Sequence, residues 1–194
     1  MPFVASLAAF RAPVPSERLE AGVVALLFAV GVLLTPWEAL AGFTFYDFHV
    51  YVENFQPDQE SLREMHDLRS PLEFFTYEIL WDEFVRLLVR IAGDPYLVMK
   101  AISGFVLWVN AYLLYRRYGY LLPTLMMLNP LFLDFALSQL RLAFAISLLL
   151  IALSMRSRVL PLCLVAATLF IHTSTPLFIG LFLVAKYVER HGQE

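Results

Sequence analysis

Residues 129–176, NPLFLDFALSQLRLAFAISLLLIALSMRSRVLPLCLVAATLFIHTSTP, decide how this chain must fold. The run 142–155 carries no charge, and neither does the run 159–171. Between them lies a short basic turn, Arg156-Ser157-Arg158. Two uncharged runs around a basic turn are typical of a membrane hairpin whose turn stays on the cytoplasmic side.

Arg141 and His172 stand at the two far ends of this hairpin. If both arms are helices, each residue lies roughly 21 Å from the cytoplasmic edge of a hydrocarbon core about 30 Å thick. An arginine at that depth costs about 2.5 to 3.5 kcal/mol on insertion scales, so we expect it to face a wet cavity or an anionic partner. The alternative is that Arg141 reaches outward to the headgroups and that His172 is a satisfied helix-end residue.

The composition places the whole chain in the membrane class. Of 194 residues, 60% are hydrophobic and 16% are charged, and the mean hydropathy is +0.68. These values exclude an ordinary soluble domain and a disordered chain. The length allows about six spans of roughly 20 residues. We therefore predict an all-α, multi-pass integral membrane protein in which residues 1–194 form a single domain.

Charge and cysteine content exclude other classes. The net charge is -3 and the basic residues are scattered among apolar runs, so we expect no nucleic-acid partner. The single cysteine, Cys163, lies in the middle of a predicted span, which argues against a disulfide framework.

Residues 1–20 form a mixed leader that we expect to be cytoplasmic. Residues 21–41 form the first predicted span, which Pro36 and Glu38 interrupt near its outer end. Within this span, Ala39-Leu40-Ala41 resembles a signal-peptidase site. Whether the first span is cleaved stays open at this point. Either outcome places the following residues outside the cytoplasm.

Residues 43–94 are predicted to form one periplasmic loop. Its part from 46 to 94 contains eleven Asp or Glu residues, four Arg and no Lys, which is the composition of the far side of a membrane. A helix over 71–92 is expected to be amphipathic and to lie on the outer surface or cap a cavity. The charged face of that helix would carry Glu78, Asp82, Glu83, Arg86 and Arg90. The apolar face would carry Phe74, Phe75, Leu80, Trp81, Phe84, Leu87, Leu88 and Ile91.

Residues 95–188 are predicted to form the helical core. A second span over 96–114 ends at a cytoplasmic arginine pair, and a third over 118–135 returns outward. The hairpin supplies the fourth and fifth spans, and residues 177–188 supply the sixth. The fifth helix has only 13 residues before its break at 172–176, so we predict a broken helix inside the outer half of the membrane. Both termini are then cytoplasmic.

This topology collects polar groups at one level near the outer face. Arg141 and His172 are the candidate catalytic residues, because an arginine fork binds a diphosphate or carboxylate and a histidine can act as general base. The candidate substrate-binding residues are Asp47, Asp134, Ser138, Gln139 and Ser174.

The sequence contains no motif typical of a metal site, a cofactor site or a nucleotide site. His49 and His66 with Asp47 and Asp67 could bind a metal, but no HxH or HExxH spacing supports it, so we predict neither metal nor cofactor. The chain has no P-loop, no GxGxxG and no GxSxG motif. A cytoplasmic nucleotide-sugar donor and ATP-driven transport are therefore not expected.

The segment SQLRLAFA at 138–145, followed about thirty residues later by His172-Thr173-Ser174, resembles EpsG-type and Wzy-type polysaccharide polymerases. In that family an (S/N)QxRQ motif precedes one span and an HxS motif ends the next. Upstream, Tyr46-Asp47-Phe48 with Tyr51, and then Glu78, are similar to the family's first outer loop. Leu142 stands where the family usually has Gln, and the chain has about half the length of a typical member.

The resemblance implies an O-antigen or exopolysaccharide polymerase, a glycosyltransferase of the bacterial inner membrane. Its donor would be an oligosaccharide linked to undecaprenyl diphosphate, a polyprenyl carrier in the lipid bilayer. Arg141 would then bind the diphosphate leaving group, and His172 would assist phosphate binding or proton transfer. Asp47 would orient the acceptor or serve as a base.

Two other functions remain open on the sequence. The chain could be a non-catalytic short relative that inhibits or regulates a full-length polymerase, as in serotype conversion, or a scaffold subunit. Each would bring further partners, either other glycan-assembly proteins or a second copy of the chain.

Overall fold

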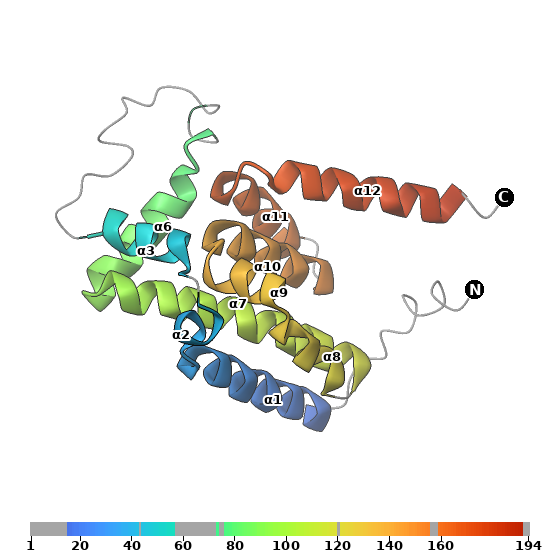
Figure 1. The fold of residues 1–194 in the computed structure, drawn as a ribbon. Coiled ribbons are helices and arrows are strands. Elements are labelled where there is room, and N and C mark those ends of the chain that lie inside the picture. The colour runs from blue at the N-terminus through green and yellow to red at the C-terminus, as the bar shows by residue number, and fades with distance from the viewer. Residues whose placement is uncertain are drawn as a thin grey trace.

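The fold was analysed in a computed structural model that describes residues 15–42, 44–56, 73, 76–119, 121–155 and 159–191. Every regular element in these ranges is a helix, which confirms the predicted all-α class for the described part (Figure 1). The elements are α1 (Pro15–Leu34), α2 (Trp37–Ala41), α3 (Tyr46–Asn54), α6 (Ile79–Ala92), α7 (Pro95–Tyr118), α8 (Leu122–Leu125), the 3-10 helix η1 (Met126–Leu128), α9 (Pro130–Leu137), α10 (Leu140–Ser154), α11 (Val159–Ile171) and α12 (Thr175–His191).

Helix α7 runs through the middle of the fold, and its ends follow directly from the sequence. The side chain of Asp94 caps the helix by accepting the N–H of Tyr96 at 2.8 Å, and Pro95 occupies the first helical position. Gly119 ends the helix in the left-handed conformation, with φ of 73°. The predicted second span therefore exists as a helix and runs slightly further than expected at its C-terminal end.

Helix α1 packs alongside α7 through small side chains (Figure 1). Ala21, Ala25 and Ala29 recur every four residues and are buried, so the two helix backbones can approach closely. At the closest point, a Cβ on Gly104 would lie 3.0 Å from Cδ1 of Leu33. Helix α1 begins at Pro15, inside the predicted leader, and ends at Leu34. The short α2 follows Pro36, where the sequence predicts an interruption of the span 21–41.

The third predicted span, 118–135, does not form one helix. The chain there is divided into α8, η1 and α9, because Asn129 adopts an extended ψ of 131° before Pro130. The Asn129 side chain then caps α9 by accepting the N–H of Leu131 at 2.9 Å. A second break follows at Ser138 and Gln139, where α9 and α10 meet at 97°.

The amphipathic helix predicted over 71–92 is shorter than expected. Glu73 and Thr76 are helical, but Tyr77 and Glu78 form a turn and α6 starts only at Ile79. Residues 71, 72, 74 and 75 lie outside the described part. Glu78 therefore lies outside the helix, as the residue that immediately precedes α6.

The predicted wet and apolar faces of this helix were also partly wrong. Asp82 is 2% exposed and accepts a hydrogen bond from Nε of Arg86 at 3.0 Å, so both charges lie against the core. Leu80, Leu87 and Ile91, which the sequence places on the apolar face, are exposed. An ion pair one helical turn apart can be buried together, and this pairing rotates the buried face of α6 away from the one that hydrophobicity alone predicts.

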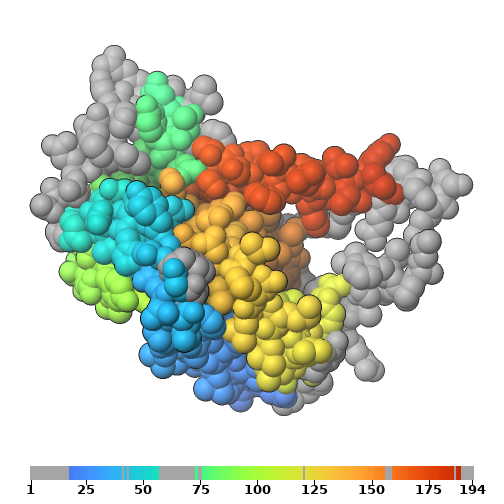
Figure 2. Space-filling model, in the orientation of Figure 1, coloured from blue at the N-terminus to red at the C-terminus, as the bar shows by residue number. Residues whose placement is uncertain are grey.

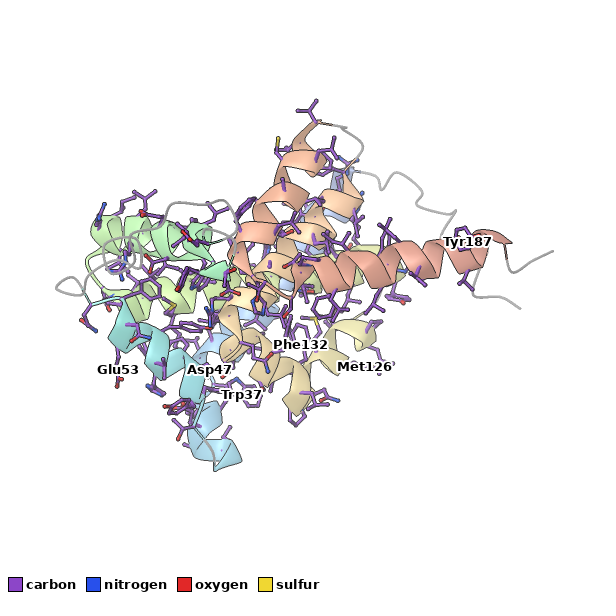
Figure 3. The ribbon with its side chains drawn as sticks, turned by 90° about the horizontal axis from the view of Figure 1, so that it is seen from above. Trp37, Asp47, Glu53, Met126, Phe132 and Tyr187 are labelled. Carbon is purple, nitrogen blue, oxygen red and sulfur yellow. The ribbon has the colours of Figure 1, made fainter. Side chains whose placement is uncertain are left out.

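The α10–α11 hairpin packs against α7 and α6, and α12 leaves it after the break at residues 172–174. Figure 3 shows the hairpin running across the direction of α12, with Tyr187 near the far end of that helix. Figure 2 shows α12 projecting from the rest of the molecule. Its outward apolar side chains are Leu177, Leu181, Phe182, Leu183, Val184, Tyr187 and Val188.

By length and composition, α7 is the one described helix that could cross a bilayer, or one of two if the bent pair α9 and α10 is counted as a single span. The apolar parts of α11 and α12, Val159–Ile171 and Thr175–Ala185, are shorter than a membrane-spanning helix. A buried core helix of a soluble protein meets the same criteria, so this finding is a weak sign of membrane association. The six-span topology and the inner-membrane location stay predictions.

Candidate functional site

The carboxylate of Glu78 is the centre of a polar cluster inside the fold. Glu78 is 5% exposed. Oε1 accepts hydrogen bonds from Nδ1 of His172 at 2.5 Å and from the backbone N–H of Thr173 at 2.8 Å, and the Thr173 hydroxyl lies 3.2 Å away. Oε2 accepts a hydrogen bond from Nη1 of Arg141 at 2.5 Å. One carboxylate thus joins both ends of the α10–α11 hairpin to the start of α6.

The backbone at Glu78 is held in an uncommon conformation. Its φ is 54°, and within the described ranges it is the one non-glycine residue with a positive φ. A side-chain-bearing residue in this left-handed region costs roughly 1 to 2 kcal/mol. The hydrogen bonds to its carboxylate offset that cost, because without them a buried charge would be unpaired.

The same contacts determine the charge on Glu78. Burial alone raises the pKa of its carboxyl group, but the hydrogen bonds from His172 and the Thr173 backbone and the positive charge of Arg141 outweigh burial. The net pKa of Glu78 is therefore below its ordinary value, and the group is ionised near neutral pH. Because an ionised carboxylate only accepts, Nδ1 of His172 must be the donor, which leaves Nε2 free to accept a proton.

Arg141 is held from a second side by Tyr51 on α3. Its Nε donates to the Tyr51 hydroxyl at 2.9 Å, while its side chain keeps 40% of its surface exposed. Burial raises the pKa of Tyr51, which the nearby charge of Arg141 only partly opposes, so the phenol stays neutral. With Nε and Nη1 engaged, Nη2 has no partner among the described residues and remains available to a ligand.

A pocket of about 160 Å³ lies next to this cluster. It is lined by Asp47, Tyr51, Gln139, Arg141, Leu142 and His172. The structure thus brings together both candidate catalytic residues and two of the five candidate substrate-binding residues, Asp47 and Gln139. Figure 3 shows Asp47 on α3.

The other three candidates lie apart from the pocket. Asp134 is on α9, where its Oδ2 lies 3.5 Å from Nε2 of Gln139. Ser138 is buried at the bend between α9 and α10. Ser174 lies in the break between α11 and α12, but the hydroxyl that reaches Glu78 belongs to Thr173. Their role in substrate binding stays a prediction.

The alternative of a metal site concerns His49, His66, Asp47 and Asp67. In the described ranges, no three His, Cys, Asp or Glu side chains gather closely enough to hold a metal ion. His66 and Asp67 lie outside those ranges. His49 points to a different part of the fold, where its Nε2 lies 3.0 Å from Oε1 of Glu38.

The sequence analysis named Glu78, Tyr51 and Thr173 within a family resemblance and assigned none of them a role in the site. The sequence correctly predicted that Arg141 needs an anionic partner, but it did not identify which acidic residue is that partner. Eleven acidic residues of the outer loop could have been that partner, and the helical spacing assigned Glu78 to a solvent face. The partner is 63 residues from Arg141 and 94 from His172, so no local pattern identifies it.

Comparison of the chain with protein-family models, with curated proteins and with solved structures finds no match.

Proposed function

We propose that this chain binds a polyprenyl-diphosphate-linked glycan at the outer face of a membrane and acts as a polysaccharide polymerase-like glycosyltransferase. The observation that carries the proposal is the shared anchoring of Arg141 and His172 on the buried Glu78, beside a pocket. An arginine can bind a diphosphate, and a histidine can accept the proton of a sugar hydroxyl. The pair therefore fits a site where these two groups meet. The resemblance of SQLRL and HTS to polymerase motifs supports the same chemistry.

In the proposed reaction, Arg141 binds the leaving group. Arg141 lines the pocket and its side chain is 40% exposed, so a diphosphate oxygen there can accept a charge-assisted hydrogen bond from the guanidinium. When the bond between the anomeric carbon and the diphosphate oxygen breaks, the electron pair stays on the diphosphate. The adjacent guanidinium then stabilises the added negative charge.

His172 takes the proton in the same step. The acceptor hydroxyl oxygen forms the new bond to the anomeric carbon, and its proton moves to Nε2 of His172. The imidazolium that results is stabilised by Glu78, which accepts Nδ1–H at 2.5 Å. Glu78 is in this proposal a positioning residue: it holds the tautomer and the ring orientation and does not itself touch the substrate.

Asp47 is proposed to orient the acceptor. It lies on α3 at the same pocket, four residues from Tyr51, and is exposed. A carboxylate there can accept hydrogen bonds from sugar hydroxyls without competing for the arginine, which Glu78 and Tyr51 already hold.

The proposal is tested with the full chain in lipid nanodiscs and a synthetic polyprenyl-diphosphate oligosaccharide. Wild-type protein should bind the lipid, and Arg141→Ala should weaken binding on the order of a hundredfold. Arg90→Ala, at an exposed arginine of α6, is the matched control and should bind like wild type. Equal binding by wild type and Arg141→Ala would show that this site does not hold the diphosphate.

Elongation of the oligosaccharide in the same sample separates catalyst from regulator. Longer glycan products from wild type support the polymerase proposal. Binding without elongation, together with inhibition of a full-length polymerase added to the nanodiscs, would favour the regulatory alternative.

A further inference from the structure

A second hollow lies on the other side of α3 from the Glu78 cluster. Its volume is about 270 Å³, and its walls come from the end of α1, α2, α3, the start of α7 and Leu137 of α9. Helix α3 separates the two sites: Asp47 and Tyr51 face the first, whereas Phe48 and His49 face the second. No part of the proposed glycan chemistry uses this hollow.

The hollow contains one fixed positive charge, Lys100. Its Nζ lies 5.9 Å from the centre of the Phe48 ring and 5.5 Å from the centre of the Tyr96 ring. Its hydrogen bond to the Leu33 carbonyl is long, at 3.5 Å. Lys100 forms no ion pair with any described residue, so most of its donor capacity is available.

The same hollow contains one fixed negative charge, Glu38. Its Oε1 accepts the backbone N–H of Phe45 at 2.8 Å and lies 3.0 Å from Nε2 of His49. Oε2 has no partner within the described part of the chain, and the side chain is 41% exposed.

Lys100 and Glu38 line the same hollow but do not form a salt bridge with each other. A simple anion at Lys100 would meet the repulsion of Glu38. A simple cation at Glu38 would gain no cation–π contact with Phe48 or Tyr96, because Lys100 already lies over both rings. A ligand that carries both signs, with its anion toward Lys100 and its cation toward Glu38, satisfies both groups.

The walls of the hollow are partly apolar, as a site for a lipid headgroup and the start of its acyl chains requires. Nε1 of Trp37 donates to the Val32 carbonyl at 2.8 Å and fixes the corner between α1 and α2 (Figure 3 labels Trp37). The volume is below the roughly 300 to 1,000 Å³ of typical drug-sized pockets. Lys100 lies about 7.5 Å along α7 from the start of that helix at Pro95, which is headgroup depth if α7 crosses the membrane.

We propose that this hollow binds a phosphoethanolamine headgroup, with the phosphate on Lys100 and the primary ammonium on Glu38. Choline is a poorer fit because its quaternary nitrogen has no N–H to donate to Oε2 of Glu38. The favoured source is a phospholipid of the surrounding bilayer, whose acyl chains would follow the apolar wall formed by Val32, Leu33 and Leu137. The inference rests on α7 spanning a membrane and is independent of the polymerase proposal.

The test uses the full chain purified in detergent, with native mass spectrometry to count retained lipids. Phosphatidylethanolamine should be retained at least about tenfold better than phosphatidylcholine or phosphatidylglycerol, because only it offers both charge-assisted contacts. Lys100→Met and Glu38→Gln should each reduce retention to the phosphatidylcholine level. Glu53→Gln, an exposed carboxylate at the other end of α3, is the control and should retain the lipid.

Three outcomes would overturn the proposal: equal retention of the three lipids, unchanged retention in both variants, or retention of phosphatidylglycerol that Glu38→Gln leaves intact. The last would mean a simple anion site. Glu38→Gln keeps the side-chain length and Lys100→Met shortens the side chain by one atom, both at partly exposed positions. A circular-dichroism melt checks that each variant is folded. Soluble phosphoethanolamine in excess identifies the source: competition means that the headgroup alone suffices, and no competition means that the acyl chains are also bound.

Discussion

Nδ1 of His172 lies 2.5 Å from Oε1 of Glu78, although 94 residues separate them in the chain. This contact ties the end of α11 to the residue before α6, and Arg141 at the start of α10 binds the other oxygen of the same carboxylate. Three segments of the chain therefore depend on one buried charge. Removing it should affect both the stability of the fold and the chemistry of the pocket.

Glu78→Gln should destabilise the fold by about 1 to 3 kcal/mol. The amide can still accept on one side, but its NH2 group would then face a donor, either Arg141 or the His172–Thr173 pair. Denaturant unfolding in detergent, followed by tryptophan fluorescence, measures the difference. Glu53→Gln on α3 is exposed and should stay within about 0.5 kcal/mol of wild type. A Glu78→Gln variant as stable as wild type would mean that the cluster contributes no net stability.

The backbone at residue 78 can be tested separately from its carboxylate. Both Glu78→Ala and Glu78→Gly remove the charge, but only glycine accepts a φ of 54° without strain. Glu78→Gly should therefore be more stable than Glu78→Ala by about 1 kcal/mol. Inside a helix the order is reversed, with alanine favoured by a similar amount. A more stable alanine variant would restore the continuous helix that the sequence predicts over 71–92.

Acid should remove the advantage that wild type has over Glu78→Gln. The pKa of Glu78 is lower in the fold than its ordinary value of 4.5, so its stabilisation is fully present above pH 4.5. It is lost as the pH falls through the lowered pKa of the folded protein. Unfolding free energies of both proteins, measured at steps from about pH 7 downward, should converge only below pH 4.5. Convergence already above that pH would contradict the lowered pKa.

Arg141 and His172 could be predicted as a pair from sequence because local rules place them. Uncharged runs of similar length and the basic turn between them put both residues at one end of a hairpin. Glu78 followed no such rule. Its position depends on a left-handed turn without glycine and on contacts across the fold, neither of which has a local signal. The buried Asp82–Arg86 pair misled the amphipathic analysis for the same reason, since paired charges behave as neutral groups in packing.

The predicted topology places residues 43–94 outside and the turn at 156–158 inside. Reporter fusions at Gln59 and Ser157 should therefore respond from opposite sides of the membrane. The same side for both would rule out the six-span path. A soluble fusion protein, recovered without detergent, would show that the exposed apolar side chains of α1 and α12 do not contact lipid.

Arg141→Lys tests whether the guanidinium acts as a fork or only as a charge. Lysine keeps the charge, but one compact ammonium cannot serve Glu78, Tyr51 and a diphosphate in fixed directions at once. We expect a loss of glycan elongation on the order of a hundredfold, from roughly 2 to 3 kcal/mol of lost stabilisation, and at least as much for Arg141→Ala. Arg90→Lys, at an exposed arginine, should have no effect.

The assay is the glycan chain-length distribution in cells that carry each variant at matched membrane abundance. Both Arg141 variants should still insert, because removing or moving a charge near the outer face does not raise the cost of insertion. Matched abundance therefore separates a chemical defect from loss of the protein. If both variants leave the distribution as in wild type, neither catalysis nor inhibition depends on Arg141. Its contacts to Glu78 and Tyr51 then hold α3, α6 and α10 together in a scaffold.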